Sequence, residues 1–369
     1  MKQNPNIIIS GGGTGGHIFP AISIANAIMQ KQPGANILFV GAKGKMEMDK
    51  VPAAGYKIIG LPITGFQRKF SLKNIALVFK LMSSLIKARR VIKEFRPDVA
   101  VGVGGYASGP LLRVANQMGV PTLLQEQNSY AGITNRLLAK KAQKICVAYE
   151  EMEAYFPIKK IRITGNPIRQ DLFKSDVVFS EAQKYFNIPE KKKVILILGG
   201  SLGARTINNA IKSNLEKVKN QDIFLIWQTG KLYYDEMLKS SLESEVTNAF
   251  ITAFIDRMEY AFAVADVIIS RAGAGTISEL CLVSKPVILV PSPNVAEDHQ
   301  TKNAMALVNK KAALMVKDAE ADALLVDKAL NLINDENQKQ TLATQIKKMG
   351  LPNASADIAD EVLKLIEKE

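Results

Sequence analysis

NIIISGGGTGGH, residues 6–17, combines a short β-branched run with a glycine-rich segment that leads into a helical pattern. This order recurs along the chain and is typical of βαβ units, which build parallel sheets. Strands are expected at residues 6–10, 37–40, 99–103 and 122–124, and again at 194–198, 224–227, 267–270 and 287–290. The predicted fold class is α/β, with two Rossmann-like doubly wound domains.

The break between the two halves is expected where Gly165-Asn166-Pro167 interrupts the periodicity. We therefore expect an N-terminal domain over residues 1–165 and a C-terminal domain over residues 166–352. A polar helix from about Ser355 is expected to close the chain. A chain of 369 residues is long enough for two domains that each bury a core.

Composition excludes several classes of protein. The chain is 47% hydrophobic and 22% charged, so the low hydrophobicity of disordered chains is absent. Cys146 and Cys281 are too few and too far apart for a disulfide framework or a cysteine zinc site, which favours a reducing compartment. No leader pattern opens the chain, and no apolar run reaches the roughly 18 residues of a membrane span. A soluble, cytoplasmic protein is expected.

The positive charge is confined to the first half of the chain. The total is +13, but residues 1–165 hold 23 basic and 8 acidic side chains, a net charge of +15, and the remainder has −2. Residues 50–93 contain ten Lys or Arg and no acidic residue. Such a balance indicates an acidic partner, whether nucleic acid, anionic lipid or a phosphorylated substrate.

Three glycine-rich loops stand where strands lead into helices. They are GGGTGGH at 11–17, GGSLGAR at 199–205 and RAGAGTISE at 271–279. Backbone N–H groups at a helix start bind phosphate, although glycines in this position also serve tight turns alone. Three such loops favour a nucleotide held by the C-terminal half, with the first loop facing it.

Two familiar phosphate motifs fit the first loop poorly. Gly11, Gly13 and Gly16 satisfy G-x-G-x-x-G, but the expected acidic residue at the end of the second strand is missing, and none occurs before Glu47. This weakens the dinucleotide interpretation. A Walker loop is excluded because His17 stands where its lysine would be.

His17 and Glu279 are candidates for direct chemistry, each with a structural alternative. The positive end of a helix dipole favours the neutral imidazole that a general base needs, but His17 is equally explained as a histidine satisfied by nearby backbone. Glu279 is either an acceptor for ribose hydroxyls or the partner of Thr276 in a capping box. With only one other histidine, His299, and no HExxH motif, no metal site is expected.

Residues 63–92 combine the loop ITGFQRKF with a helical run. Lys73, Lys80, Ser84 and Lys87 share one stripe, which favours a core helix with a solvated polar stripe. The loop mixes aromatic and basic side chains, as expected of a surface that docks on anionic lipid. The docking residues proposed are Phe66, Arg68, Lys69, Phe70 and Lys73. Nucleic acid is a weaker alternative, because no binding module is present.

With these residues laid out, the chain resembles the MurG family. These enzymes transfer N-acetylglucosamine from UDP-N-acetylglucosamine to lipid I, undecaprenyl-pyrophosphoryl-N-acetylmuramyl-pentapeptide, in bacterial peptidoglycan synthesis. The resemblance spans nearly the whole chain and rests on GGGTGGHIFP, GVGGYASGP, QEQN, GNPIR, GGSLGAR, FID, RAGAGTISE and DHQTKNA. It implies a GT-B fold with two Rossmann-like domains facing across a cleft, and a final helix, 353–369, that returns to the first domain. Leu202 and the glycine-poor ITGFQRKF loop depart from the family pattern.

The resemblance also implies site residues. Arg169 and Ser201 would face the nucleotide and its diphosphate, the backbone of Ile255 would contact uracil, Glu279 would hold the ribose and Gln300 the sugar. The phosphate cradle would be Ala274, Gly275 and Thr276, followed by Ile277 and Ser278, with Thr14, Gly15, Gly16 and Asn128 completing the donor site from the first domain. His17, Gly104, Gly105 and Tyr106 would face the acceptor.

The expected reaction is an inverting transfer to the C4 hydroxyl of the acceptor sugar, forming lipid II, with His17 as base and Glu126 in reserve. No metal or other cofactor is expected, because the loops can stabilise the leaving diphosphate. The expected place is the cytoplasmic face of the bacterial inner membrane, peripherally bound to an anionic surface, without nucleic acid. A nicotinamide-dependent oxidoreductase, a non-catalytic lipid- or nucleic-acid-binding protein, and a related GT-B transferase or sugar-nucleotide epimerase remain alternatives.

Overall fold

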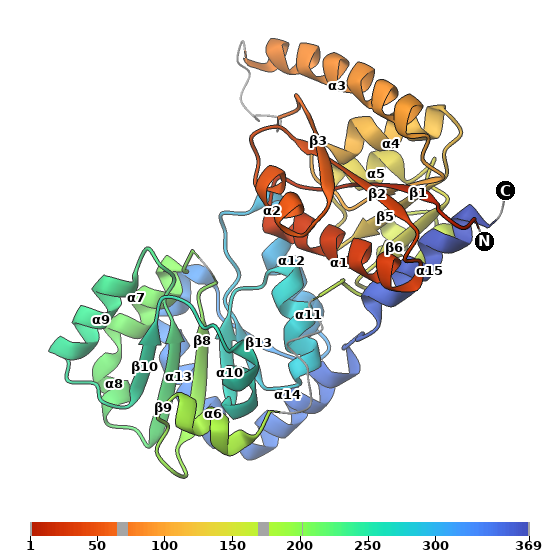
Figure 1. The fold of residues 1–369 in the computed structure, drawn as a ribbon. Coiled ribbons are helices and arrows are strands. Elements are labelled where there is room, and N and C mark those ends of the chain that lie inside the picture. The colour runs from red at the N-terminus through yellow and green to blue at the C-terminus, as the bar shows by residue number, and fades with distance from the viewer. Residues whose placement is uncertain (1, 65–72, 169–176, 201, 368–369) are drawn as a thin grey trace. The chain divides into compact units, whose positions relative to one another are not determined.

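The computed structural model describes residues 2–64, 73–168, 177–200 and 202–367. The chain forms two compact units: Met1–Ile168 with Leu351–Glu369, and Arg169–Gly350. The unit boundaries lie near the expected ones at 165 and 352. Each unit is an α/β layer structure built on its own parallel sheet (Figure 1).

The first unit is built on a seven-stranded sheet of order β3-β2-β1-β4-β5-β6-β7, and each neighbouring pair is parallel. Its strands are β1 Asn6–Ser10, β2 Asn36–Ala42, β3 Lys57–Leu61, β4 Val99–Gly102, β5 Thr122–Glu126, β6 Lys144–Val147 and β7 Ile161–Ile163. Its helices are α1 Gly15–Lys31, α2 Glu47–Ala53, α3 Lys73–Phe95, α4 Ser108–Gln117, α5 Ile133–Leu138 and α15 Ala354–Ile366, with 3-10 turns η1 Met152–Ala154 and η2 Ile158–Lys160.

The second unit is built on a six-stranded parallel sheet of order β10-β9-β8-β11-β12-β13. Its strands are β8 Lys193–Leu198, β9 Ile223–Gln228, β10 Ala249–Thr252, β11 Val267–Ser270, β12 Val287–Leu289 and β13 Leu314–Met315. Its helices are α6 Phe179–Tyr185, α7 Arg205–Ser213, α8 Leu215–Lys219, α9 Tyr234–Glu243, α10 Met258–Val264, α11 Ala274–Val283, α12 His299–Val308, α13 Ala321–Asn334 and α14 Glu336–Lys348, with η4 Ala296–Asp298 and η5 Asp318–Glu320.

All eight strands expected from the sequence are present, with ends within two residues of the prediction. They are the central strands, which are buried on both faces because helices cover a parallel sheet on each side. β3, β6, β7, β10 and β13 were not predicted. These strands are short or lie near a sheet edge, and several carry charged residues such as Lys57 and Arg162, so their apolar signal is weak.

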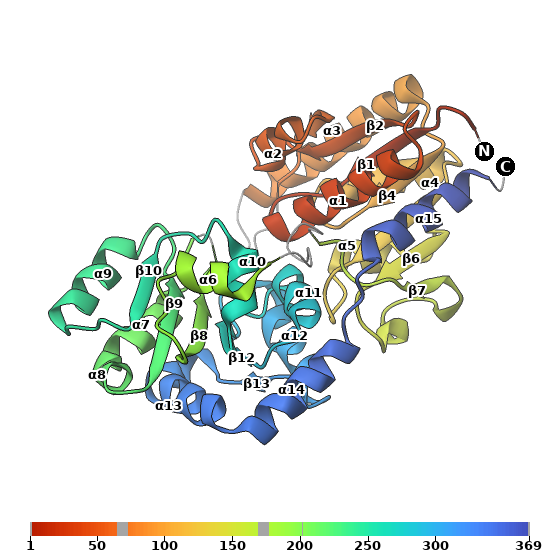
Figure 2. The ribbon, with the colours of Figure 1, turned by 60° about the horizontal axis from the view of Figure 1, so that its bottom comes forward.

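The final helix, α15, returns to the first unit and lies alongside α1 (Figure 2). Its expected polar character is wrong, because Ile358, Ala359 and Val362 are fully buried in the core that α1 shares. Lys31 pairs with Asp360 across the two helices at 2.5 Å. The chain thus completes the first unit with a segment that follows the whole second unit in sequence.

Helix α3 buries a different face from the one predicted. Ser84, placed in the solvated stripe, is fully buried, and Lys87 donates a hydrogen bond to the carbonyl of Gly60 at 2.9 Å. The exposed face is instead largely apolar: Val78, Phe79, Leu81, Met82 and Ile86 are 41–72% exposed. No described helix is long and apolar enough to cross a membrane.

Candidate functional site

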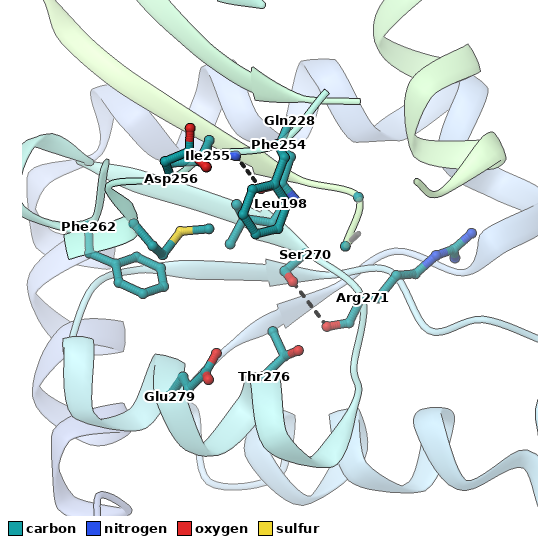
Figure 3. A pocket seen from close by; sticks show the side chains of 13 residues that line it. Leu198, Gln228, Phe254, Ile255, Asp256, Phe262, Ser270, Arg271, Thr276 and Glu279 are labelled. Carbon is teal, nitrogen blue, oxygen red and sulfur yellow. Dashed lines mark hydrogen bonds between the residues drawn. The ribbon is translucent and has the colours of Figure 1, made fainter. Parts of the chain in front are cut away.

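A pocket of about 220 Å³ lies at the carboxyl ends of the central strands of the second unit (Figure 3). The strands β8, β9 and β11 end at this pocket, as expected for ligand sites in doubly wound sheets. Its lining residues come from these strand ends and the loops that follow them, from α10 with the loop before it, and from α11. They are Leu198, Gly199, Gly200, Gln228, Phe254, Ile255, Asp256, Met258, Phe262, Ser270, Arg271, Thr276 and Glu279.

The third glycine loop forms the start of α11 at the pocket wall. The helix begins at Ala274 with Gly273 as its N-cap, and Ile277 N donates to Gly273 O at 2.9 Å. The capping-box interpretation is therefore wrong, because Thr276 and Glu279 both lie inside the helix and on the pocket side (Figure 3). A glycine cap brings no side chain that competes for the first N–H groups, so this end of α11 suits an anion.

Gln228 and Ile255 form the opposite side of the pocket. The backbone N–H of Ile255 donates to Gln228 Oε1 at 3.1 Å, and both residues are 3% exposed (Figure 3). The predicted uracil contact therefore lies in the pocket wall. Gln228 and the aromatic Phe254 were not singled out from the sequence. Their signal was available, because Gln228 ends a buried strand and Phe254 belongs to the FID motif.

Arg271 opens the third loop but does not face the α11 residues. Its guanidinium pairs with Asp318 and donates to the carbonyl of Val290 at 3.0 Å, and its side chain points away from Thr276 and Glu279 (Figure 3). Asp318 also accepts a hydrogen bond from Thr206 Oγ1 at 2.9 Å, on the first turn of α7. This arrangement ties the third loop to the helix that follows the second loop.

The second loop is held by contact between glycine backbones. A Cβ on Gly230 would lie 2.1 Å from the nitrogen of Gly203, so neither position has room for a side chain. Gly200, Gly203 and Gly230 all have positive φ, which glycine adopts without strain. Gly199 and Gly203 therefore pack tightly against the end of β9 and the turn that follows it.

The other predicted donor residues of this unit lie nearby in different roles. Ile277 is 2% exposed, so its side chain belongs to the core, and Ser278 Oγ donates to the carbonyl of Ala274 at 3.1 Å. Gln300, in the first turn of α12, accepts a hydrogen bond from Ser292 N at 2.9 Å. Gly275 has open space where a Cβ would point. Arg169 and Ser201 lie outside the described residues.

In the first unit, the predicted residues meet at the ends of β1, β4 and β5, which are neighbours in the sheet. Thr14 is the N-cap of α1, and its side chain does not cap the helix but lies 3.0 Å from His17 Nδ1. A Cβ on Gly104 would lie 2.7 Å from His17 Cδ2. The imidazole therefore packs directly on the turn that follows β4.

The remaining predicted residues of this group surround the same loop. A Cβ on Gly13 would lie 3.8 Å from the ring of Tyr106, which is 48% exposed. Gly15 and Gly16 form the first turn of α1.

Of the predicted membrane-docking residues, Lys73 begins α3, whereas Phe66, Arg68, Lys69 and Phe70 lie outside the described residues.

Glu126 is built into the protein interior. It is 2% exposed, and its two oxygens accept hydrogen bonds from Gly132 N, Asn135 Nδ2, and both the backbone N and Nδ2 of Asn128. Burial raises the pKa of this carboxyl above its ordinary value, and these hydrogen bonds offset that rise only in part. Four accepted bonds fill the lone-pair sites of a carboxylate. This geometry argues against Glu126 as a proton acceptor and assigns it to the placement of Asn128.

Two family models match the chain. Residues 7–147 match the glycosyltransferase family 28 N-terminal domain, and residues 194–362 match the glycosyltransferase family 28 C-terminal domain. The chain belongs to glycosyltransferase family 28. The three glycine loops of this transferase all fall within the two matched segments.

Relatives of this family 28 glycosyltransferase match it from end to end. A Bacteroides thetaiotaomicron protein named UDP-N-acetylglucosamine--N-acetylmuramyl-(pentapeptide) pyrophosphoryl-undecaprenol N-acetylglucosamine transferase is 59% identical, covering 100% of both chains. A protein of the same name from Christiangramia forsetii is 55% identical over 99% of each. The structure of Acinetobacter baumannii MurG matches with a TM-score of 0.81 at 26% identity, over 98% of this chain and 99% of that one. The predicted GT-B fold and MurG-family membership are confirmed.

The fold is shared more widely than the family. UDP-GlcNAc 2-epimerase from Neisseria meningitidis matches with a TM-score of 0.66 at 16% identity, over 98% of this chain and 100% of that one. At this identity the likeness concerns the fold alone. The family 28 domains and the full-length relatives therefore separate this transferase from that alternative.

Replacing the two candidate bases should separate a structural residue from a reactive one. Glu126→Ala leaves several buried donors without an acceptor, and each costs about 1–3 kcal/mol, so we expect the free energy of unfolding to fall by at least about 2 kcal/mol. His17→Ala, at a partly buried position, should change it by less than about 1 kcal/mol. Urea unfolding of both variants measures this. Wild-type stability of Glu126→Ala would contradict the structural assignment.

Proposed function

We propose that the chain transfers N-acetylglucosamine from UDP-N-acetylglucosamine to the N-acetylmuramyl-pentapeptide of lipid I. The observation that carries the proposal is the end-to-end identity of 59% to a relative named for this reaction. The pocket of the second unit supports it, since it joins an apolar wall to a carboxylate and to a helix start whose N-cap is a glycine. The apolar wall suits a nucleobase, the carboxylate suits ribose hydroxyls, and the helix start suits a diphosphate.

The donor would lie with its uracil against Ile255 and Phe254 and its ribose hydroxyls on Glu279. A carboxylate accepts two hydrogen bonds from neighbouring hydroxyls, and Glu279 lines the pocket one turn after Thr276. The diphosphate would then reach the first turn of α11, at Ala274 to Thr276. Gln300, and Thr14, Gly15, Gly16 and Asn128 of the first unit, are proposed to complete the contacts to the sugar and phosphates.

His17 is proposed as the base. When Nδ1–H donates to Thr14 Oγ1, Nε2 carries the lone pair that takes a proton. The proton moves from the acceptor C4 hydroxyl to Nε2 as the oxygen bonds to the anomeric carbon. The bond from that carbon to the β-phosphate oxygen breaks, and UDP leaves from the opposite face with the electron pair. Backbone N–H groups stabilise the leaving charge, so we propose that the step needs no metal.

The acceptor's lipid chain calls for attachment to a membrane, and α3 suits that role. Its exposed apolar side chains stand beside exposed Lys80, Arg89 and Arg90, in a region of residues 50–93 without acidic side chains. Apolar burial and attraction to anionic lipid reinforce each other in such surfaces. We propose peripheral binding to the anionic cytoplasmic face of the inner membrane through this helix and the loop before it.

One assay tests the reaction. Purified protein is incubated with labelled UDP-N-acetylglucosamine and a short-chain lipid I analogue, and we expect the disaccharide product. His17→Ala should reduce turnover at least about 100-fold without changing UDP affinity. Excess chelator should leave the rate unchanged. Donor binding without transfer would overturn the proposed function, and activity lost to chelator and restored by magnesium would overturn the metal-free step.

Glu279→Gln tests the donor site. Because a hydrogen bond to a charged group contributes about 1.5–3 kcal/mol, we expect UDP affinity to fall at least tenfold in titration calorimetry. The thermal midpoint should stay within 2 °C (about 1 kcal/mol or less) because Gly273, not Thr276, caps α11. Glu236→Gln, an exposed carboxylate of the same unit, is the matched control. Lowered stability with intact affinity would return Glu279 to a structural role.

Removing apolar side chains from α3 tests the membrane surface. The double variant Phe79→Ser, Ile86→Ser should bind vesicles containing phosphatidylglycerol at least tenfold more weakly, because two exposed side chains lose about 1 kcal/mol or more each. Neutralising Arg68, Lys69 and Lys73 should weaken binding most at low salt. UDP affinity should be unchanged in both variants. Leu242→Ser, at a 68% exposed leucine of the second unit, is the control; equal losses there would refute the assignment.

A further inference from the structure

A buried carboxylate lies against the first glycine loop. Glu47, the first residue of α2, is 0% exposed. Its Oε2 accepts a hydrogen bond from Gly13 N at 2.9 Å, and its Oε1 accepts one from Ala42 N at the end of β2, also at 2.9 Å. Among the described residues no lysine or arginine forms an ion pair with it. Its charge is therefore held by backbone N–H groups.

Two glycines make room for this side chain. A Cβ on Gly12 would lie 2.3 Å from Glu47 Oε1, and a Cβ on Gly41 would lie 2.5 Å from Glu47 Cγ. Neither distance occurs in real structures, so any side chain at either position displaces the carboxylate. The Glu47 side chain can therefore occupy this place only because both neighbours are glycines.

The contact continues from Glu47 to His17. Gly12, against which the carboxylate lies, packs on Gly105, where a Cβ would be 2.3 Å from the Gly12 carbonyl oxygen. The neighbouring Gly104 packs on the His17 imidazole. One continuous series of close contacts therefore runs from the Glu47 carboxylate through the first loop and the turn after β4 to His17, the proposed base.

We propose that Glu47 is a positioning residue for the acceptor side of the transfer. It holds Gly12 and Gly13 in the place that sets the turn at Gly104 and Gly105, and through that turn the imidazole of His17. Glu47 also accepts the hydrogen bond of the Gly13 N–H. The diphosphate of the acceptor would therefore bind to the N–H groups at the start of α1, next to His17. In a dinucleotide site that loop N–H would serve the cofactor, which makes the arrangement unfit for nicotinamide cofactors.

A carboxylate suits this role in a way that its amide does not. Both N–H groups that meet Glu47 are donors, and a carboxylate offers only acceptors. In Glu47→Gln one donor would face the amide NH₂ and remain without an acceptor, so the loop loses one of its two anchors. Gly41→Ala leaves the carboxylate intact but displaces it, and so tests position separately from charge.

The kinetic test rests on the proposed function and uses the full chain with UDP-N-acetylglucosamine and a soluble lipid I analogue. For both Glu47→Gln and Gly41→Ala we expect kcat/KM for the acceptor to fall at least tenfold, with UDP affinity within twofold of wild type. Glu361→Gln, a buried carboxylate on α15 of the same unit, is the control: we expect it to lower stability but leave acceptor kcat/KM within twofold. Equal losses in all three variants, or wild-type acceptor kinetics in Glu47→Gln, would overturn the proposal.

A measurement on the unmodified protein separates this inference from the transfer reaction. Hydrogen exchange resolved to single amides should show Gly13 protected to the level of strand amides, although it lies in a loop. Glu47→Gln should speed exchange at Gly13 at least tenfold. Exchange as fast as an open loop in wild type would refute the contact, whatever the enzyme transfers. Protection of Gly13 in a protein without transfer activity would leave the contact standing and refute the reaction.

Discussion

The close approach of glycine backbones at strand ends is the constraint on which the structure of both sites depends. In the first unit Gly12 packs on Gly105, and in the second Gly203 packs on Gly230. Each pair joins the loop after the first strand of a unit to the loop after a neighbouring strand. A side chain at Gly105, Gly203 or Gly230 would push the loops apart, and one at Gly12 would displace the Glu47 carboxylate. Because the loops meet, the helices after them begin at a shared edge, where their N-termini can face one ligand.

Much of this arrangement was predictable from the sequence. The central strands are mostly apolar, as in VILIL at 194–198, and β1, β8 and β11 are followed by glycines before a helical pattern, so the fold class and the positions of the three glycine loops followed directly. Edge strands such as β3 and β7 were missed because they are short and mixed in polarity. Side chains at strand ends, such as Gln228, carry no motif; their place at the end of a buried strand is a signal, but the sheet order is needed to show that they face one pocket.

The errors have a common physical origin. Thr276 and Glu279 have the spacing of a capping box, but the helix already begins at Ala274, with Gly273 as its N-cap. Spacing alone does not locate a helix start. Ser84 was placed in solvent because polar residues usually are, whereas α3 buries it and exposes Phe79 and Met82. Glu126 is predicted only as a reserve base, and the four hydrogen bonds that its oxygens accept inside the protein could not be read from the sequence. In each case the tertiary environment outweighed the residue type.

The pairing of Arg271 with Asp318 has a consequence for how the two units respond to ionic strength. The guanidinium is neutralised inside the second unit, whose sequence carries almost no net charge, so a diphosphate on α11 would be held mainly by short-range N–H dipoles. The membrane binding proposed for the first unit would depend on dispersed positive charge, which salt screens over a distance of about 8 Å at physiological concentration. On that proposal, rising ionic strength would weaken binding to a charged surface long before it weakened binding of a nucleotide, and the enzyme would leave the membrane with its donor site still filled.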